Sequence, residues 1–200
     1  MVHEMEDYYF QEEILQDFVH NHPENSSIFA VELKVKLLNL FYSTYISATG
    51  LMAKHICALR IDDALKRGDV NIIEKIAKLN LSNDKVRENY SFATKYCALH
   101  QPTKYPIFDS IVCDTFLKLL TEGYLRPQYT YAAHPKSKGE YSKASFVTKV
   151  LRNYPEYCRF YKYFMKKCNI QDKNFRDVDW YIWGAFKLDK IDSELEKLCC

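Results

Sequence analysis

The chain has 200 residues, of which 48% are hydrophobic and 15% aromatic, with only 5 glycines and 6 prolines. This composition is too apolar for a disordered protein and too poor in turn residues for a β-sandwich, so it favours one packed all-α domain over residues 1–200. No apolar run approaches the roughly 18 residues of a membrane-spanning helix, and the start lacks the order of a signal peptide. We therefore expect a cytoplasmic protein without membrane association, whose seven cysteines are reduced thiols.

Helical periodicity recurs along most of the chain. In the most regular segment, which we expect to be a central helix, Ala30, Leu33, Leu37 and Leu40 recur at spacings of three and four residues. Asp69 is expected to cap a short helix that contains Ile72, while residues 80–89 form a polar connection and residues 124–141 a long loop. The remaining helices are predicted over residues 4–20, 28–47, 51–67, 90–100, 110–121, 144–153, 155–168 and 175–187.

Acidic and basic residues are unevenly distributed. The first 25 residues contain seven acidic residues and no lysine or arginine, which makes the predicted N-terminal helix a candidate docking surface for a protein partner. Residues 136–167 contain nine lysines and arginines against two acidic residues, interleaved with tyrosine and phenylalanine. Such a stretch fits two interpretations: a DNA surface with phosphate-binding and stacking groups, or a solvated helix face above a core stripe.

The most informative stretch is NYSFATKYCALHQPTKYPIFDSIV, residues 89–112. It predicts a helix, an extended link that begins before Pro102, and a second helix that starts behind Asp109. This order resembles the active-site segment of the helix-hairpin-helix DNA glycosylase superfamily, in particular its 8-oxoguanine-glycosylase-like branch. In that family an apolar-Pro-apolar run precedes a catalytic aspartate, which Asp109 matches. The resemblance implies an all-α, two-lobed fold and DNA base excision.

Asp109 has a physical rationale in such a reaction. Cleavage of an N-glycosidic bond develops positive charge on the sugar, which a fixed carboxylate stabilises. The base must also leave the duplex and stack on aromatic rings, for which Tyr90, Tyr105 and Phe108 are candidates. The alternative is that Asp109 only caps the helix over residues 110–121.

Lys95 is the candidate for a catalytic amine, because it is the nearest lysine on the helix before Asp109. Bifunctional family members have their lysine where Tyr90 stands here, so lyase activity is not expected. The alternative for Lys95 is a lysine on the surface or in contact with a phosphate. The DNA-binding residues that we predict are Lys85, Arg87, Asn89, Tyr90, Lys104, Tyr105, Lys136, Lys138, Lys143 and Lys149.

Three functions therefore remain open: a base-excision DNA glycosylase in DNA repair, a catalytically inactive relative that binds DNA, and a helical protein-interaction component. The family hairpin usually contains glycine, which residues 81–89 lack, and this difference favours the inactive relative. No cofactor or metal is expected, because Cys97 and His100 have the spacing of only half a metal site. The segment around Trp180 and Trp183 is interpreted as a core helix.

Overall fold

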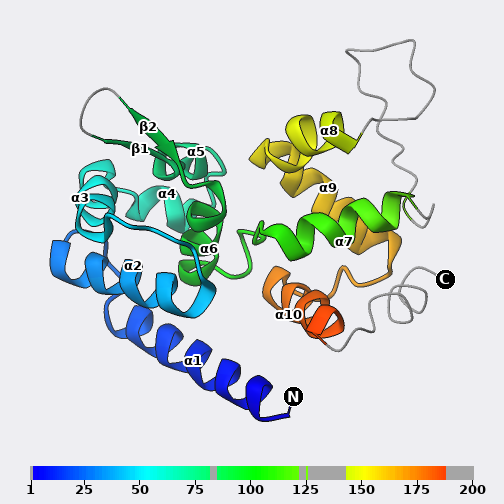
Figure 1. The fold of residues 1–200 in the computed structure, drawn as a ribbon, viewed down its shortest axis with the longest axis horizontal. Coiled ribbons are helices and arrows are strands. Elements are labelled where there is room, and N and C mark those ends of the chain that lie inside the picture. Colours follow the sequence, from blue (N-terminus) through cyan, green and yellow to red (C-terminus); the bar gives the residue numbers. More distant parts are fainter. Residues whose placement is uncertain (1, 82–84, 122–124, 126–142, 188–200) are drawn as a thin grey trace. The chain divides into compact units, whose positions relative to one another are not determined.

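The computed structural model describes residues 2–81, 85–121, 125 and 143–187. The chain divides into two compact units, Met1–Tyr105 and Pro106–Cys200 (Figure 1). The all-α class is confirmed, since the described residues contain only two short strands beside the helices. The expectation of a single domain over residues 1–200 stays a prediction.

The first unit is built around a fully buried helix, α6. Residues 92–99 of α6 are buried on all sides, which explains why this helix is apolar around most of its circumference. Helix α2 packs against α1 and α3, while α5 packs against α6. The helices of this unit are α1 (Val2–Asn21), α2 (Ile28–Tyr42), α3 (Thr49–Leu59), α4 (Asp62–Arg67), α5 (Ile72–Ala77) and α6 (Tyr90–His100).

A short β-hairpin replaces the polar connection that we expected over residues 80–89. Strands β1 (Lys78–Asn80) and β2 (Val86–Glu88) pair antiparallel, with Leu79 opposite Arg87. The backbone N–H of Asn89 donates to the carbonyl of Ala77 at 2.8 Å and closes the base of the hairpin. The hairpin therefore leads directly into α6, where the family resemblance would place a helical hairpin.

Two predicted helices of the first unit are shorter in the structure. The helix predicted over residues 28–47 ends at Tyr42, where Ser43 adopts a left-handed φ of 48°. The helix predicted over residues 51–67 is two helices, separated at Arg60, whose φ is also 48°. Non-glycine residues rarely adopt this conformation, so the sequence does not announce either break. The N-cap of α5 is Asn71 rather than Asp69, whose carboxylate accepts from the Asn71 N–H at 3.0 Å.

The buried face of α2 also differs from the prediction. Leu33 and Leu40, which belong to the predicted apolar stripe, are 43% and 72% exposed. The core side of α2 instead carries Val31, Lys34, Val35 and Leu38.

The second unit has an aromatic core centred on Phe116. Its ring meets those of Phe160, Tyr161 and Phe164 at centroid distances of 5.0 to 5.5 Å, in edge-to-face arrangements. The elements are α7 (Ser110–Thr121), α8 (Lys143–Phe146), the π-helix η1 (Val147–Leu151), α9 (Tyr154–Lys167) and α10 (Phe175–Lys187). The predicted loop over residues 124–141 lies outside the described residues except for Leu125.

A search of the described residues for membrane spans found no helix with the length and apolar character needed to cross a bilayer.

Candidate functional site

Asp109 lies at the end of a link that the second unit holds firmly. The Tyr154 hydroxyl donates to the carbonyl of Pro106 at 3.0 Å, and the Tyr157 hydroxyl donates to that of Ile107. Phe108 is buried, with its ring edge-to-face on Tyr157 at 5.7 Å. Buried carbonyls in an extended segment need such partners, and these fix the backbone immediately before Asp109.

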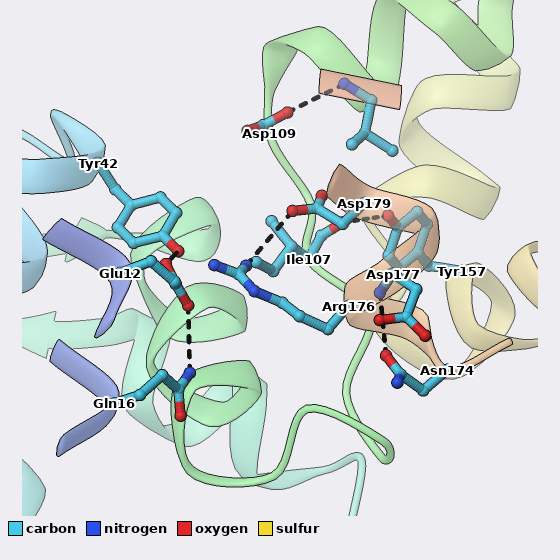
Figure 2. Close-up of polar contacts among 11 residues, drawn as sticks. Glu12, Gln16, Tyr42, Ile107, Asp109, Tyr157, Asn174, Arg176, Asp177 and Asp179 are labelled. Carbon is cyan, nitrogen blue, oxygen red and sulfur yellow. Dashed lines mark hydrogen bonds and ion pairs between the residues drawn. The ribbon is translucent and has the colours of Figure 1, made fainter. Parts of the chain in front are cut away.

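The Asp109 carboxylate caps α7. Its Oδ1 accepts from the backbone N–H of Val112 at 2.9 Å. A dashed line at Asp109 marks this hydrogen bond in Figure 2. The structure therefore shows that Asp109 caps the helix, and whether it also has a catalytic role stays a prediction. The carboxylate is half-buried, and its role as a cap does not exclude a second role in stabilising a positive charge.

A second carboxylate, which the sequence reasoning missed, shares the neighbourhood of Asp109. Asp179 of α10 is buried, and its Oδ2 lies 3.4 Å from Nη1 of Arg176 (Figure 2). The Arg176 guanidinium also lies over the ring of Trp180. Burial raises the pKa of Tyr161 well above its usual value, and the carboxylates of Asp179 and Asp109 raise it further. The two carboxylates therefore act on the same buried hydroxyl, which has no hydrogen-bond partner among the described residues.

A sequence signal for this pair existed. Asp179 follows Arg176 by three positions, which is a spacing of intrahelical ion pairs. The surrounding tryptophans led to the interpretation of a core helix, which hid the signal.

The aromatic candidates for base stacking are buried in the described structure. Tyr90 and Tyr105 are 7% and 1% exposed, and the Tyr105 hydroxyl donates to the carbonyls of Ala64 and Asp69 at 3.2 and 3.3 Å. Stacking of a base on either ring requires the surrounding packing to open.

Lys95 is buried inside the first unit. It is 7% exposed, and its Nζ lies 5.4 Å from the centre of the Tyr42 ring. The Tyr42 hydroxyl donates to Glu12 of α1, which also accepts from Gln16 (Figure 2). The structure thus excludes the alternative of Lys95 as a surface lysine, and it places the ammonium against an aromatic face.

The candidates on and near the hairpin take different positions. Lys85 is exposed, whereas Arg87 donates to Oγ of Ser47 at 2.9 Å and to the carbonyl of Tyr45 at 3.0 Å. Asn89 is buried at the base of the hairpin, and Lys104 donates to the carbonyl of Lys66. Arg87, Asn89 and Lys104 therefore already stabilise local structure.

In the basic stretch, the described residues form a solvated face over a core stripe. Phe160, Tyr161 and Phe164 of α9 are fully buried, so they are core residues and offer no stacking surface. The exposed basic residues are Lys149, Arg152, Arg159, Lys162, Lys166 and Lys167. Lys136 and Lys138 lie outside the described residues, and Lys143 is the first residue of α8. Of the two interpretations, the structure favours the core stripe for the aromatic rings and leaves the charges on the surface.

The first unit also has a pocket that the sequence did not indicate. It is about 240 Å³ in volume and lies between α1, α4 and the end of α6, with His20, Asp62, Lys66 and His100 among its lining residues. Burial and the nearby Lys34 lower the pKa of His100 to about 3, so this imidazole is neutral at physiological pH. Lys34, whose charge interacts with Asp62, is fully buried, and burial lowers its pKa to about 8.

Comparisons with known proteins match a family model and one relative. The family model HI_0787_N, described as an N-terminal domain, matches residues 1–104. The chain belongs to this family. It is also 31% identical over 150 residues to an uncharacterized protein of Haemophilus influenzae, a match that covers 74% of this chain and 62% of the relative. The chain thus spans less than two thirds of that relative's length. No solved structure matches the chain.

The boundary of the family match agrees with the structure. The match ends at residue 104, and the first compact unit ends at Tyr105. Family membership therefore includes α1 to α6 and the pocket, whereas Asp109 and Asp179 lie beyond the matched residues.

Proposed function

We propose that this cytoplasmic protein binds DNA and cleaves the N-glycosidic bond of a damaged or modified base, with Asp109 as its catalytic carboxylate. The observation that carries the proposal is the position of Asp109. It is half-buried at the start of α7, directly after a link whose carbonyls are held by Tyr154 and Tyr157. A catalytic carboxylate must be fixed before the reaction starts, because electrostatic stabilisation depends on preorganisation.

The proposed chemistry is hydrolysis. As the bond between C1′ and the base nitrogen breaks, its electron pair leaves with the base, and the Asp109 carboxylate stabilises the positive charge on the sugar. Water then attacks C1′, and the proton that it loses balances the proton that the departing base takes up. We assign attack to water because α6 begins with Tyr90 and because Lys95 is buried against Tyr42.

DNA binding is proposed to rest on phosphate contacts. In the second unit, Lys149 of η1 and Lys162 and Lys166 of α9 are exposed, and in the first unit Lys85 is exposed. Because the aromatic rings of α9 are buried, we assign the affinity to charge rather than to stacking.

A DNA-binding relative without catalytic activity is the second candidate. It is favoured by the absence of a lysine at the start of α6, where Tyr90 is 7% exposed. In that case Asp109 acts only as the N-cap of α7.

DNA affinity measured by fluorescence anisotropy over a range of salt concentrations tests the DNA-directed proposal. We expect affinity to fall steeply with salt, and the double variant Lys162→Glu/Lys166→Glu to lower the log–log slope by about two, one unit for each phosphate contact. The matched control is Lys54→Glu/Lys75→Glu, which changes two exposed lysines of the first unit by the same charge. No binding at about 50 mM salt, or binding that salt leaves unchanged, contradicts DNA binding.

A further inference from the structure

The pocket of the first unit contains a carboxylate that is held in one orientation. The backbone N–H of Asn25 donates to Oδ1 and Oδ2 of Asp62 at 3.1 and 3.2 Å, and the Asn25 side-chain amide donates to Oδ1 at 2.6 Å. Asn25 is itself 1% exposed. Each carboxylate oxygen accepts about two hydrogen bonds, so Oδ1 is saturated by Asn25 and Oδ2 of this pocket-lining residue has room for one more donor.

A buried polar network fixes Asn25 in turn. Nζ of Lys34 donates to the carbonyl of Glu24 at 2.9 Å and to Oδ1 of Asn25 at 3.2 Å, and the Tyr96 hydroxyl donates to the same oxygen at 2.5 Å. Burial of an ammonium group is costly unless hydrogen bonds and an opposite charge compensate for it. Here the compensating charge is Asp62, with Asn25 bonded to both groups.

The remaining wall of the pocket combines an unpartnered imidazole nitrogen, the end of a helix and apolar side chains. His100 is uncharged at physiological pH, and its Nε2 is buried without a hydrogen-bond partner among the described residues. α6 ends at His100, and the C-terminus of a helix carries partial negative charge. Val19, Leu65 and Leu99 add apolar surface, whereas the cationic Lys66 is exposed at the mouth.

We propose that this pocket binds a small planar ligand through an N–H edge, either an amidinium group or an aminoheterocycle, with the Asp62 carboxylate as the acceptor. A fixed carboxylate oxygen with room for one more hydrogen bond favours a ligand N–H, because hydrogen bonds to a carboxylate are charge-assisted and strong. The apolar side chains pack against the faces of the ring. This site is independent of the proposed reaction at Asp109.

Isothermal titration of the full chain with three compounds tests the site. Benzamidine presents the N–H groups of a charged amidinium, and 2-aminopyrimidine presents those of a neutral amino group. N,N-dimethylbenzamide has a ring of similar size without any N–H. We expect benzamidine or 2-aminopyrimidine to bind with a Kd of about 1 mM or tighter, and the dimethyl compound at least about tenfold more weakly. Whichever N–H compound binds better identifies the charge of the natural ligand. Equal binding of all three, or no binding, overturns the proposal.

Substitutions at adjacent positions locate the binding. Asp62→Asn is expected to weaken binding of the preferred compound at least about tenfold, since it removes a charge-assisted acceptor. Asp63→Asn is the matched control, because Asp63 is the next residue of α4 and is exposed; it should leave the Kd unchanged. If Asp62→Asn fails to fold, amide chemical shifts of the wild-type chain decide. Ligand-induced changes confined to α1, α4 and the end of α6 support the site, and changes elsewhere overturn it.

Discussion

At the scale of single residues, Lys34 is the most unusual feature of the first unit. It is fully buried on the core side of α2, two residues from the exposed Lys36. Its ammonium is held by the carbonyl of Glu24 and the side chain of Asn25. A lysine among the apolar residues of one helix face is the sequence signal for a buried ammonium group. This signal was not recognised at Lys34, because the other face of α2 is apolar as well and was taken for the core side.

The lowered pKa of Lys34 predicts a specific dependence of stability on pH. Burial lowers this pKa from 10.5 to about 8, so between these values the folded chain binds fewer protons than the unfolded chain. The free energy of unfolding of the wild type relative to Lys34→Met should therefore rise with pH in this window, by roughly 3 kcal/mol in total. Urea denaturation at several pH values measures it.

Lys36→Met is the control for this series, because Lys36 is an exposed residue of the same helix that pairs with Glu32. The free energy of unfolding of the wild type relative to Lys36→Met should not rise comparably between pH 8 and 10.5. A stability difference between wild type and Lys34→Met that stays constant from neutral to alkaline pH argues against a buried, titrating Lys34.

At the scale of elements, the sequence predicted some boundaries correctly and missed others for identifiable reasons. Helices α6 and α7 have the predicted bounds, because Pro102 and Asp109 are strong signals for a helix end and a helix start. The break at Arg60 depends on a left-handed residue that is not glycine, and sequence patterns do not reveal it. The hairpin of β1 and β2 was missed because three-residue strands are too short for an alternating pattern.

The choice of the wrong face for α2 has a different cause. Leu33 and Leu40 recur with helical spacing, and so do Val31, Val35 and Leu38. A helix that is apolar on both sides contains two stripes, and periodicity alone does not select the one that faces the core. Only the packing against α1 and α3 decides between them.

The stability of the protein reports on Asp109 as the N-cap of α7, independently of the proposed chemistry. Asp109→Ala should lower the free energy of unfolding by about 1 kcal/mol, whereas Asp109→Asn, which retains a capping oxygen, should change it by a few tenths at most. Urea denaturation measures both. Asp114→Ala, at an exposed position of α7, serves as the control and should have little effect. Equal stability of Asp109→Ala and wild type would mean that the hydrogen bond to Val112 contributes nothing.

At the scale of the whole molecule, the resemblance implied two lobes, but the boundary after Tyr105 could not be placed from the sequence, since no linker rich in Gly, Ser or Pro marks it. The two candidate sites lie in different units: the Asp62 pocket in the first, and Asp109 with Asp179 in the second. Asp109 was predictable because a motif surrounds it. Asp62, Asn25 and Lys34 come from three separate segments, so only the fold brings them together.

The first unit should fold by itself. Its core is formed by α1 to α6, its last residue is anchored through the Tyr105 hydroxyl, and the family match has nearly the same boundary. A fragment of residues 1–105 is expected to show a helical circular dichroism spectrum and one cooperative thermal transition. A disordered fragment would contradict this division of the chain.

The most direct test of the central claim is release of a base from DNA. Wild type and Asp109→Asn are incubated with a panel of duplexes that each contain one damaged or modified base, and the freed base is quantified. We expect wild type to release at least one of these bases. Asp109→Asn should be slower by a factor of about 10² to 10³, the usual loss when one well-placed electrostatic group is removed from a transition state. Its DNA affinity should be unchanged or slightly higher, because a negative charge is lost. No release from any duplex by the wild type, or an undiminished rate in Asp109→Asn, would contradict the assignment of Asp109 as the catalytic carboxylate.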